Sequence, residues 1–222
     1  MKIVIIGASE NGHGKACLHV CNESGTGEAV GFVDDNPSLH GKKICGLPVL
    51  GGCDTLPELR ADGVDGAFIG IGDNAIRRRL FRQVMDAGFD TPNLIHPTAY
   101  IGSDVALGRG IFIGVNAVLI AGVSVGDFAL INTAASIDHD CRIGEAVFVG
   151  PGVHLASNVT VEEEAFVGIG AVCIQNTMIG ERAVVGAGAV VIRDVLPHTT
   201  CVGVPAAPMQ RSSPRVAIVN ER

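Results

Sequence analysis

Hydrophobic residues recur at every sixth position along the second half of the chain. From Ile95 to Val191 these positions form 17 consecutive units, each aliphatic or cysteine, with no insertion. The fourth residue after each is Ala, Val, Ile, Cys or Thr, and nine of the 17 residues that directly follow are glycine. An α-helix repeats about every 3.6 residues and a strand about every two, so neither produces this pattern. A fixed short repeat of this kind predicts a solenoid.

Each unit of six residues supplies one short strand with an inward aliphatic side chain, and one corner. Three faces per turn make 18 residues per coil, so the 17 units predict between five and six coils. We expect Val and Ile to stack on the equivalent residues of the next coil. We also expect the glycines that follow the inward residues to relieve the backbone where φ is positive at the corners. In such a prism each coil is stabilised by its neighbours.

The first 94 residues follow a different pattern, in which strands and helices alternate. The expected strands are 2–6, 29–33 and 66–71, the expected helices are 15–21, 55–61 and 75–87, and a glycine-rich turn occupies 7–14. This alternation predicts a Rossmann-like α/β domain. We therefore divide the chain into a Rossmann-like domain at 1–94, a parallel β-helix at 95–196 and a C-terminal loop and tail at 197–222.

Composition and charge narrow the possible functions. The chain has 222 residues, 47% of them hydrophobic, and a net charge of −7, so it can bury a core but lacks the clustered basic residues that bind nucleic acid or an anionic membrane. The apolar run at residues 3–6 is too short for a signal peptide or a membrane span, so we expect a cytoplasmic protein. Seven cysteines without a C-x-x-C pair indicate free thiols and no zinc site.

The glycine-rich turn is a candidate anion site. A strand, then Gly7 to Gly14, then a helix would direct backbone N–H groups and a helix N-terminus toward a phosphate. The dinucleotide fingerprint G-x-G-x-x-G fails because Ser9 occupies its second glycine position, so NAD is not expected. Asp34 nevertheless lies where NAD enzymes bind a ribose hydroxyl. His13, between two glycines, is either a substrate contact or an ordinary turn residue.

His139 is the candidate general base among the seven histidines. It stands at the third position of a unit, where the side chain leaves the prism, and its neighbours Asp138 and Asp140 are carboxylates. A carboxylate that accepts from one imidazole N–H fixes the tautomer and raises the basicity of the other nitrogen. The residues alone are equally compatible with a polar corner residue that has no chemical role.

Several segments together resemble the PglD/NeuD-type sugar acetyltransferases, and the repeat resembles the hexapeptide-repeat acyltransferases with their left-handed parallel β-helix. The segments are Gly7 to Lys15, Asp34-Asp35, Ile71 to Asn74 with Arg77, Ile95 to Ala99, and Gly203 to Ala206. The resemblance covers nearly the whole chain. It implies that the first domain holds a nucleotide-linked sugar and that the β-helix holds acetyl-CoA. One departure is the insertion of Glu10-Asn11 before Gly12.

The resemblance also implies roles for individual residues. His139 would be the base and Asp140 the acid that increases its basicity, with Asp138 as a further orienter and Asn132 near the acceptor amine. The implied substrate-binding residues are Gly12, His13, Gly14, Asp34, Asp35, Gly72 and Asn74. The implied acetyl-CoA contacts are His154, Ser157, Ile169, Ala187, Gly203 and Pro205. His154 has the alternative of being a plain exposed histidine.

The expected activity is N-acetylation of a nucleotide-linked amino sugar, of the 4-amino-4,6-dideoxyhexose type, by a homotrimer that needs no metal. Two other functions remain open at this stage. One is a sialic-acid-type sugar O-acetyltransferase, which uses the same scaffold on a hydroxyl. The other is a non-catalytic trimeric module that only binds a nucleotide.

Overall fold

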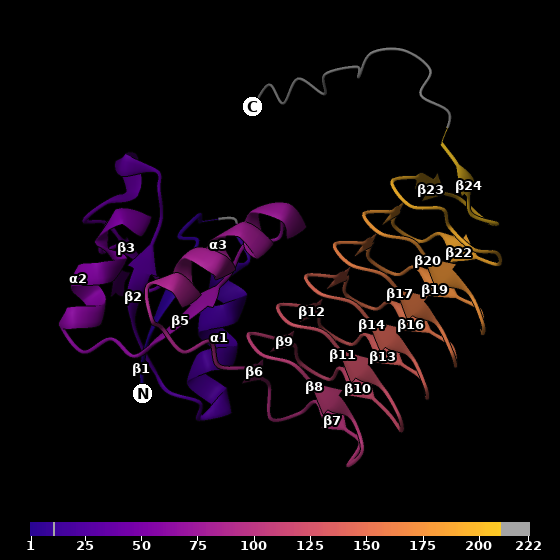
Figure 1. Cartoon of the computed structure of the whole chain (residues 1–222), viewed down its shortest axis with the longest axis horizontal. Coiled ribbons are helices and arrows are strands. Elements are labelled where there is room, and N and C mark those ends of the chain that lie inside the picture. The colour runs from indigo at the N-terminus through magenta and orange to yellow at the C-terminus, as the bar shows by residue number, and fades with distance from the viewer. Residues whose placement is uncertain (11, 210–222) are drawn as a thin grey trace.

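The computed structural model describes residues 1–10 and 12–209, which form an α/β part followed by a left-handed parallel β-helix (Figure 1). This confirms the predicted fold class. The first part lies beside the lower coils of the β-helix, and the remaining coils continue away from it (Figure 1). None of the helices in the described ranges has the length and hydropathy that crossing a bilayer requires.

The α/β part is built on a three-stranded parallel sheet in the order β2-β1-β5. Its strands are β1 (Lys2–Ile6), β2 (Glu28–Val33) and β5 (Gly66–Ile69), and its helices are α1 (Gly14–Ser24), α2 (Leu56–Ala61) and α3 (Asn74–Asp86). A small hairpin, β3 (Lys43–Ile44) and β4 (Leu47–Pro48), lies between two short 3-10 helices, η1 (Pro37–Leu39) and η2 (Cys53–Thr55). Successive residues of β1 point to opposite faces, so Ile3 and Ile5 pack with α1 whereas Val4 and Ile6 pack with α2 and α3.

The β-helix has three faces, each named here after its first strand. The β6 face contains β6 (Leu94–Ile95), β9 (Phe112–Ile113), β12 (Leu130–Ile131), β15 (Phe148–Val149), β18 (Phe166–Val167), β21 (Val184–Val185), β23 (Thr200–Val202) and β24 (Ala207–Pro208). The β7 face contains β7 (Tyr100–Ile101), β10 (Val118–Leu119), β13 (Ser136–Ile137), β16 (His154–Leu155), β19 (Val172–Cys173) and β22 (Val190–Val191). The β8 face contains β8 (Ala106–Leu107), β11 (Ser124–Val125), β14 (Arg142–Ile143), β17 (Thr160–Val161) and β20 (Met178–Ile179).

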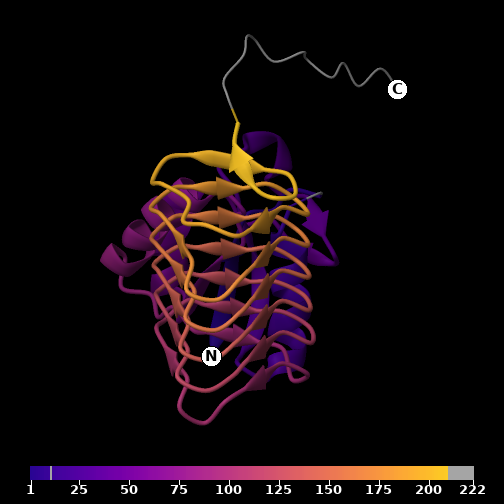
Figure 2. The ribbon, with the colours of Figure 1, turned by 90° about the vertical axis from the view of Figure 1, so that its right-hand side faces the viewer.

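Successive coils stack in register with the expected offset of 18 residues (Figure 2). Ile137, for example, pairs with Leu119 below and Leu155 above, and all three side chains are buried inside the prism. The aliphatic ladder seen in the sequence is therefore the core of the stack. The predicted boundary after residue 94 falls inside β6, and β23 continues the β6 face past residue 196.

The expectation about the corner glycines is wrong in its physical reason. Gly126, Gly144 and Gly168 do not have positive φ, whereas Asn116 and Asp140, at the fourth position of the unit, do. Close packing explains these glycines instead. A Cβ on Gly144 would lie 2.8 Å from the backbone nitrogen of the next coil, closer than real Cβ contacts allow.

A buried arginine joins the two parts of the molecule. Arg77 lies on α3 and is only 1% exposed. Its guanidinium donates to the carbonyl oxygens of Ile71 (3.0 Å) and Gly72 (3.3 Å) and, across the junction, to those of Phe128 (2.9 Å) and Ala146 (2.7 Å). A buried charge is tolerated only when its hydrogen bonds are satisfied in this way. Arg77 therefore holds the loop before α3 against two coils of the β-helix.

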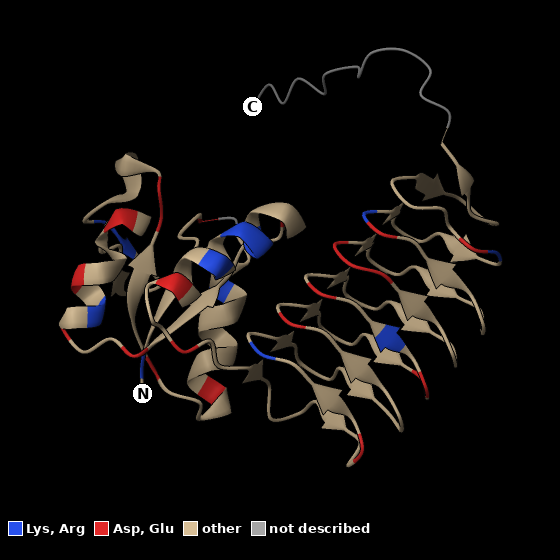
Figure 3. Ribbon diagram, in the orientation of Figure 1, with Lys and Arg blue, Asp and Glu red and all other residues tan. Residues whose placement is uncertain are grey.

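An ion-pair network reinforces the same junction on its solvent side. Arg78 on α3 contacts Glu145 (2.6 Å), Glu163 (2.9 Å) and Glu164, and Arg182 also contacts Glu164 (3.0 Å). Figure 3 shows acidic residues along the edge of the β-helix that faces the arginines of α3. Because Arg77 and Arg78 are adjacent, one turn of α3 provides both the buried and the ionic contact.

Candidate active site

The two functional side chains of the predicted dyad protrude from one corner of the β-helix. The strand β13 ends at the buried Ile137, so residues 138–140 leave the prism between the β7 and β8 faces. His139 Nδ1 lies 2.8 Å from Asp140 Oδ2. Since the carboxylate can only accept, Nδ1 carries the proton and donates it, which leaves the Nε2 lone pair available as a base.

Two carboxylates set the electrostatics of His139. The hydrogen bond to Asp140 raises the pKa of His139 above its ordinary value, and the nearby charge of Asp138 acts in the same direction. Asp138 Oδ1 also accepts the backbone N–H of His139 (2.8 Å). These contacts orient the imidazole and make it more basic, as acid–base chemistry on a bound amine requires.

Asn132 lies at a different corner of the same coil. It follows β12, so it occupies the corner between the β6 and β7 faces, and the strand β13 separates it from His139. Its side-chain oxygen accepts the backbone N–H of Thr133 (2.9 Å). A single chain therefore does not bring the predicted base and the predicted amine-contacting residue together.

The residues predicted to contact acetyl-CoA fall into the same two groups. Ser157 lies one coil above His139, where Asn158 donates its backbone N–H to the His139 carbonyl (3.0 Å). Ile169, which is 58% exposed, and Ala187 stack at the corner that holds Asn132. His154 lies between the groups, on the β7 face.

Three predicted contacts have surroundings that bear on a ligand. His154 Nδ1 is 2.6 Å from Ser136 Oγ, so this ring nitrogen already has a partner. Gly203, with φ of 93°, follows β23, and Pro205 lines an apolar cavity of about 470 Å³ with Ile192 and Leu196. Exposed apolar side chains at Ile169 and in this cavity suit the pantetheine arm of acetyl-CoA, which has few polar groups.

The Asp34-Asp35 pair is divided between two tasks. Both oxygens of Asp34 accept backbone N–H groups, from Ala8 (2.8 Å) and Asn36 (2.9 Å). The Asp34 carboxylate therefore holds the glycine loop against the end of β2, a role that the predicted ribose contact did not anticipate. Asp35 uses Oδ1 for the N–H of Cys53 (2.8 Å), and of the pair it is the better placed to meet a ligand.

The glycine loop packs against the β-helix through His13. The imidazole of His13 contacts the ring of Phe112 edge-on, with centroids 4.7 Å apart, and its Nε2 has no hydrogen-bond partner among the described residues. Burial lowers the pKa of His13 to about 4, helped by the charge of Arg77, so the ring is neutral at pH 7. A Cβ on Gly14 would overlap the Gly7 carbonyl, whereas Gly12 only faces Ser9.

Asn74 has a structural role in place of the predicted substrate contact. Its amide nitrogen donates to the carbonyls of Glu164 (2.8 Å) and Ala165 (3.0 Å), and its oxygen accepts from Arg77 (2.8 Å). These three bonds use the whole side-chain amide at the junction with the β-helix. Gly72, in contrast, lines a cavity of about 490 Å³ between the loop before α3 and the β6 face.

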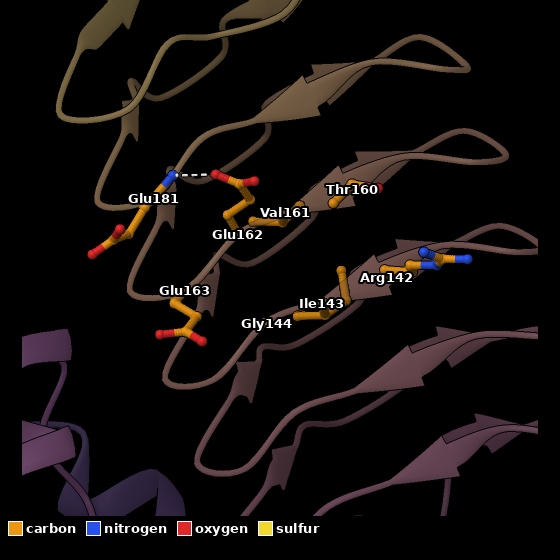
Figure 4. Close-up of a pocket in the computed structure, with 8 residues that line it drawn as sticks. All are labelled: Arg142, Ile143, Gly144, Thr160, Val161, Glu162, Glu163 and Glu181. Carbon is orange, nitrogen blue, oxygen red and sulfur yellow. Dashed lines mark hydrogen bonds between the residues drawn. The ribbon is translucent and has the colours of Figure 1, made fainter.

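A further cavity of about 420 Å³ lies on the β8 face (Figure 4). Glu162, Glu163 and Glu181 line one end of it, and Glu162 accepts the backbone N–H of Glu181 (2.9 Å). The guanidinium of Arg142 points away from these glutamates (Figure 4). An acidic lining of this kind is unsuited to the phosphates of CoA or of a nucleotide.

One cluster of His and Glu side chains has the composition of a metal site. Ligand atoms of His19, Glu23 and His96 lie within 4.8 Å of one another. The backbone N–H of Thr98 donates to His96 Nδ1 (3.1 Å), so the ring proton resides on Nε2, which faces Glu23 at 3.1 Å. The nitrogen that faces the cluster thus has no lone pair to offer, and these residues do not fit a metal ion.

Comparisons with known proteins place this geometry among sugar acetyltransferases. The family model described as the PglD N-terminal domain matches residues 2–84. A mutant of perosamine N-acetyltransferase from Caulobacter crescentus, in complex with CoA and GDP-perosamine, is 38% identical with a TM-score of 0.90, over 95% of this chain and 97% of that chain. The acetyltransferase domain of PglB from Neisseria gonorrhoeae is 34% identical with a TM-score of 0.84, over 94% of this chain and 99% of that chain.

Two further matches complete the comparison. The same PglB domain in complex with acetyl coenzyme A is 32% identical with a TM-score of 0.76, over 94% of this chain and 98% of that chain. An uncharacterised protein of Acanthamoeba polyphaga mimivirus is 27% identical over 120 residues, which are 54% of this chain and 23% of that protein. The chain thus spans about a quarter of the length of this viral relative.

Proposed function

The chain belongs to the PglD/NeuD-type family of sugar acetyltransferases, and on that premise we propose that it transfers the acetyl group of acetyl-CoA to the amino group of a nucleotide-linked amino sugar. The observation that carries the proposal is the His139–Asp140 pair, which holds a basic nitrogen at an exposed corner of the β-helix. Relatives with CoA, acetyl-CoA or GDP-perosamine bound support both substrates.

The proposed chemistry uses Nε2 of His139 as the general base. As the sugar amine attacks the thioester carbonyl, Nε2 accepts a proton from the nitrogen, a C–N bond forms and the C–S bond breaks. Asp140 stabilises the resulting imidazolium, which then returns its proton to the thiolate of CoA. Acetyl-CoA supplies an acyl group with a good leaving group, so no metal step is needed for the balance of atoms and charges.

The acceptor and the base are proposed to come from different protomers of a trimer. The glycine loop packs on Phe112 of the β6 face, and Asn132 lies at the adjoining corner of that face. His139 lies across the β7 face from Asn132. If three β7 faces surround a threefold axis, the Asn132 corner of one protomer meets the His139 corner of the next, and the two groups of acetyl-CoA residues meet in the same way.

A mixing experiment tests this shared site. We would combine His139→Asn and Asn132→Ala protomers, co-expressed in equal amounts and purified as trimers. A shared site is intact when His139 comes from one variant and Asn132 from the other, so about a quarter of the wild-type activity should return. Mixed trimers that stay as inactive as the two parent variants would show that both residues serve one protomer's own site.

The reaction itself is tested by mass spectrometry after incubation with acetyl-CoA and a panel of nucleotide-linked sugars. A GDP-linked 4-amino-4,6-dideoxyhexose is the first acceptor to try, because a solved relative binds GDP-perosamine. A product that gains one acetyl group on nitrogen supports the proposal. Acetylation of a hydroxyl would indicate the O-acetyltransferase alternative, and binding of the nucleotide without any release of CoA would indicate a non-catalytic module.

A further inference from the structure

Gly122 lies directly below Asp140 in the stack, because equivalent positions of successive coils are 18 residues apart. Both residues have left-handed backbone at the corner between the β7 and β8 faces, with φ of 71° and 59°. A Cβ on Gly122 would lie 2.6 Å from Asp140 Oδ1. Real Cβ atoms do not approach an oxygen so closely, so an added methyl group and this carboxylate cannot both keep their places.

Backbone conformation alone does not require glycine at position 122. Ala134 and Ala146 occupy the same kind of left-handed corner, with φ of 55° and 54°. Gly152 is also left-handed, with φ of 62°, but nothing lies within 4 Å of where its Cβ would be. What distinguishes Gly122 is therefore the space that it leaves for the carboxylate above it.

The two oxygens of Asp140 belong to one rigid carboxylate. Oδ2 accepts from His139 Nδ1 at 2.8 Å, while Oδ1 lies over Gly122. A contact that displaces Oδ1 must rotate the group and move Oδ2 away from the imidazole. We propose that Gly122 is a positioning residue for the His139–Asp140 pair, a role that rests on the proposed use of His139 as the base.

The side chain of Asp140 is the part most free to move. Its carboxylate is 61% exposed, whereas the Asp140 backbone is fixed by its N–H bond to the Ala121 carbonyl (2.9 Å). The backbone of Gly122 is fixed in turn by its N–H bond to Asp104 Oδ2 (3.0 Å). A Gly122→Ala protein should therefore keep its fold and lose the alignment of the pair.

The test measures the titration of the His139 ring by ¹⁵N NMR together with kcat. The charged groups around the ring are Asp138 and Asp140 on its own corner, Arg142 on β14 and Asp104 two coils below Asp140. In Gly122→Ala we expect the pKa of His139 to fall toward that of the Asp140→Asn protein, and kcat to fall about tenfold. Gly152→Ala is the matched control and should change neither quantity.

A double-mutant cycle shows whether Gly122 acts through Asp140. Gly122→Ala should lower kcat in the wild-type background and have no further effect in an Asp140→Ala background. Equal losses in both backgrounds, an unchanged His139 titration in Gly122→Ala, or a Gly122→Ala protein that fails to fold would each overturn the proposal. If Asp140→Asn itself leaves the His139 titration and kcat unchanged, the His139–Asp140 pair is the part that fails, independently of Gly122.

Discussion

Removing one charge at the junction should reveal how strongly the ion-pair network holds the two parts of the molecule together. Glu164 is 4% exposed in its side chain and accepts hydrogen bonds from Arg182 and Arg78. These partners lower the pKa of Glu164 to about 2, from an ordinary value of 4.5. At about 1.4 kcal/mol per pKa unit, the shift corresponds to a stabilisation on the order of 3 kcal/mol when the carboxylate is charged.

The sign follows from the lowered pKa. The stabilisation is complete above the ordinary pKa of about 4.5 and is lost as the pH falls toward about 2. Glu164→Gln should therefore lower the free energy of unfolding by on the order of 2–3 kcal/mol at pH 7, and by little at pH 2. Arg78 keeps Glu145 and Glu163 as partners, so the variant does not leave a buried unpaired cation.

Thermal unfolding of wild type and variant from pH 7 to pH 2 is the assay. A loss of that size should lower the Tm at pH 7 by about 5–10 °C. The control is Glu181→Gln, because Glu181 is 44% exposed and only 3.7 Å from Arg182, so its loss should be small. A difference between Glu164→Gln and wild type that stays constant over this pH range would refute the reasoning.

Three other predictions follow from single side chains. Because burial lowers the pKa of His13 to about 4, stability should fall as the pH drops from about 6.5 to 4, and His13→Gln should flatten that part of the curve measured by chemical denaturation. Asp140→Asn should move the acidic limb of the kcat/KM profile to lower pH, since the lost hydrogen bond raises the pKa of His139; an unmoved limb would exclude this pairing. Asp35→Ala should raise KM for the nucleotide sugar and spare KM for acetyl-CoA, whereas Asp34→Ala should chiefly lower Tm because it frees the loop N–H of Ala8; the reverse outcome would exchange the two roles.

The period of six made the β-helix predictable because every unit repeats the same demand for an inward aliphatic side chain. Ile137, Leu119 and Leu155 stack as the sequence indicates. The corner glycines were misjudged because two different constraints select the same residue. Positive φ and close backbone approach both favour glycine, and the sequence does not show which coil lies above Gly144.

The candidate site was predictable where its contacts are local and missed where they are distant. His139 and Asp140 are neighbours in the chain, so their pairing could be expected from the sequence. Asn74 bonds carbonyl groups 90 and 91 residues away, and every residue has a carbonyl, so no sequence pattern announces that contact. The space below Asp140 has the same character, because Gly122 meets it only after one full coil.

The central claim is that His139 removes a proton from an acceptor amine during acetyl transfer. The measurement that tests it most directly is steady-state acetylation of a GDP-linked 4-amino sugar by wild-type protein and by His139→Asn, with both KM values determined. The account predicts a kcat about 10²- to 10⁴-fold lower in the variant and a KM for acetyl-CoA that is nearly unchanged. A variant that acetylates the amine at the wild-type rate would contradict it.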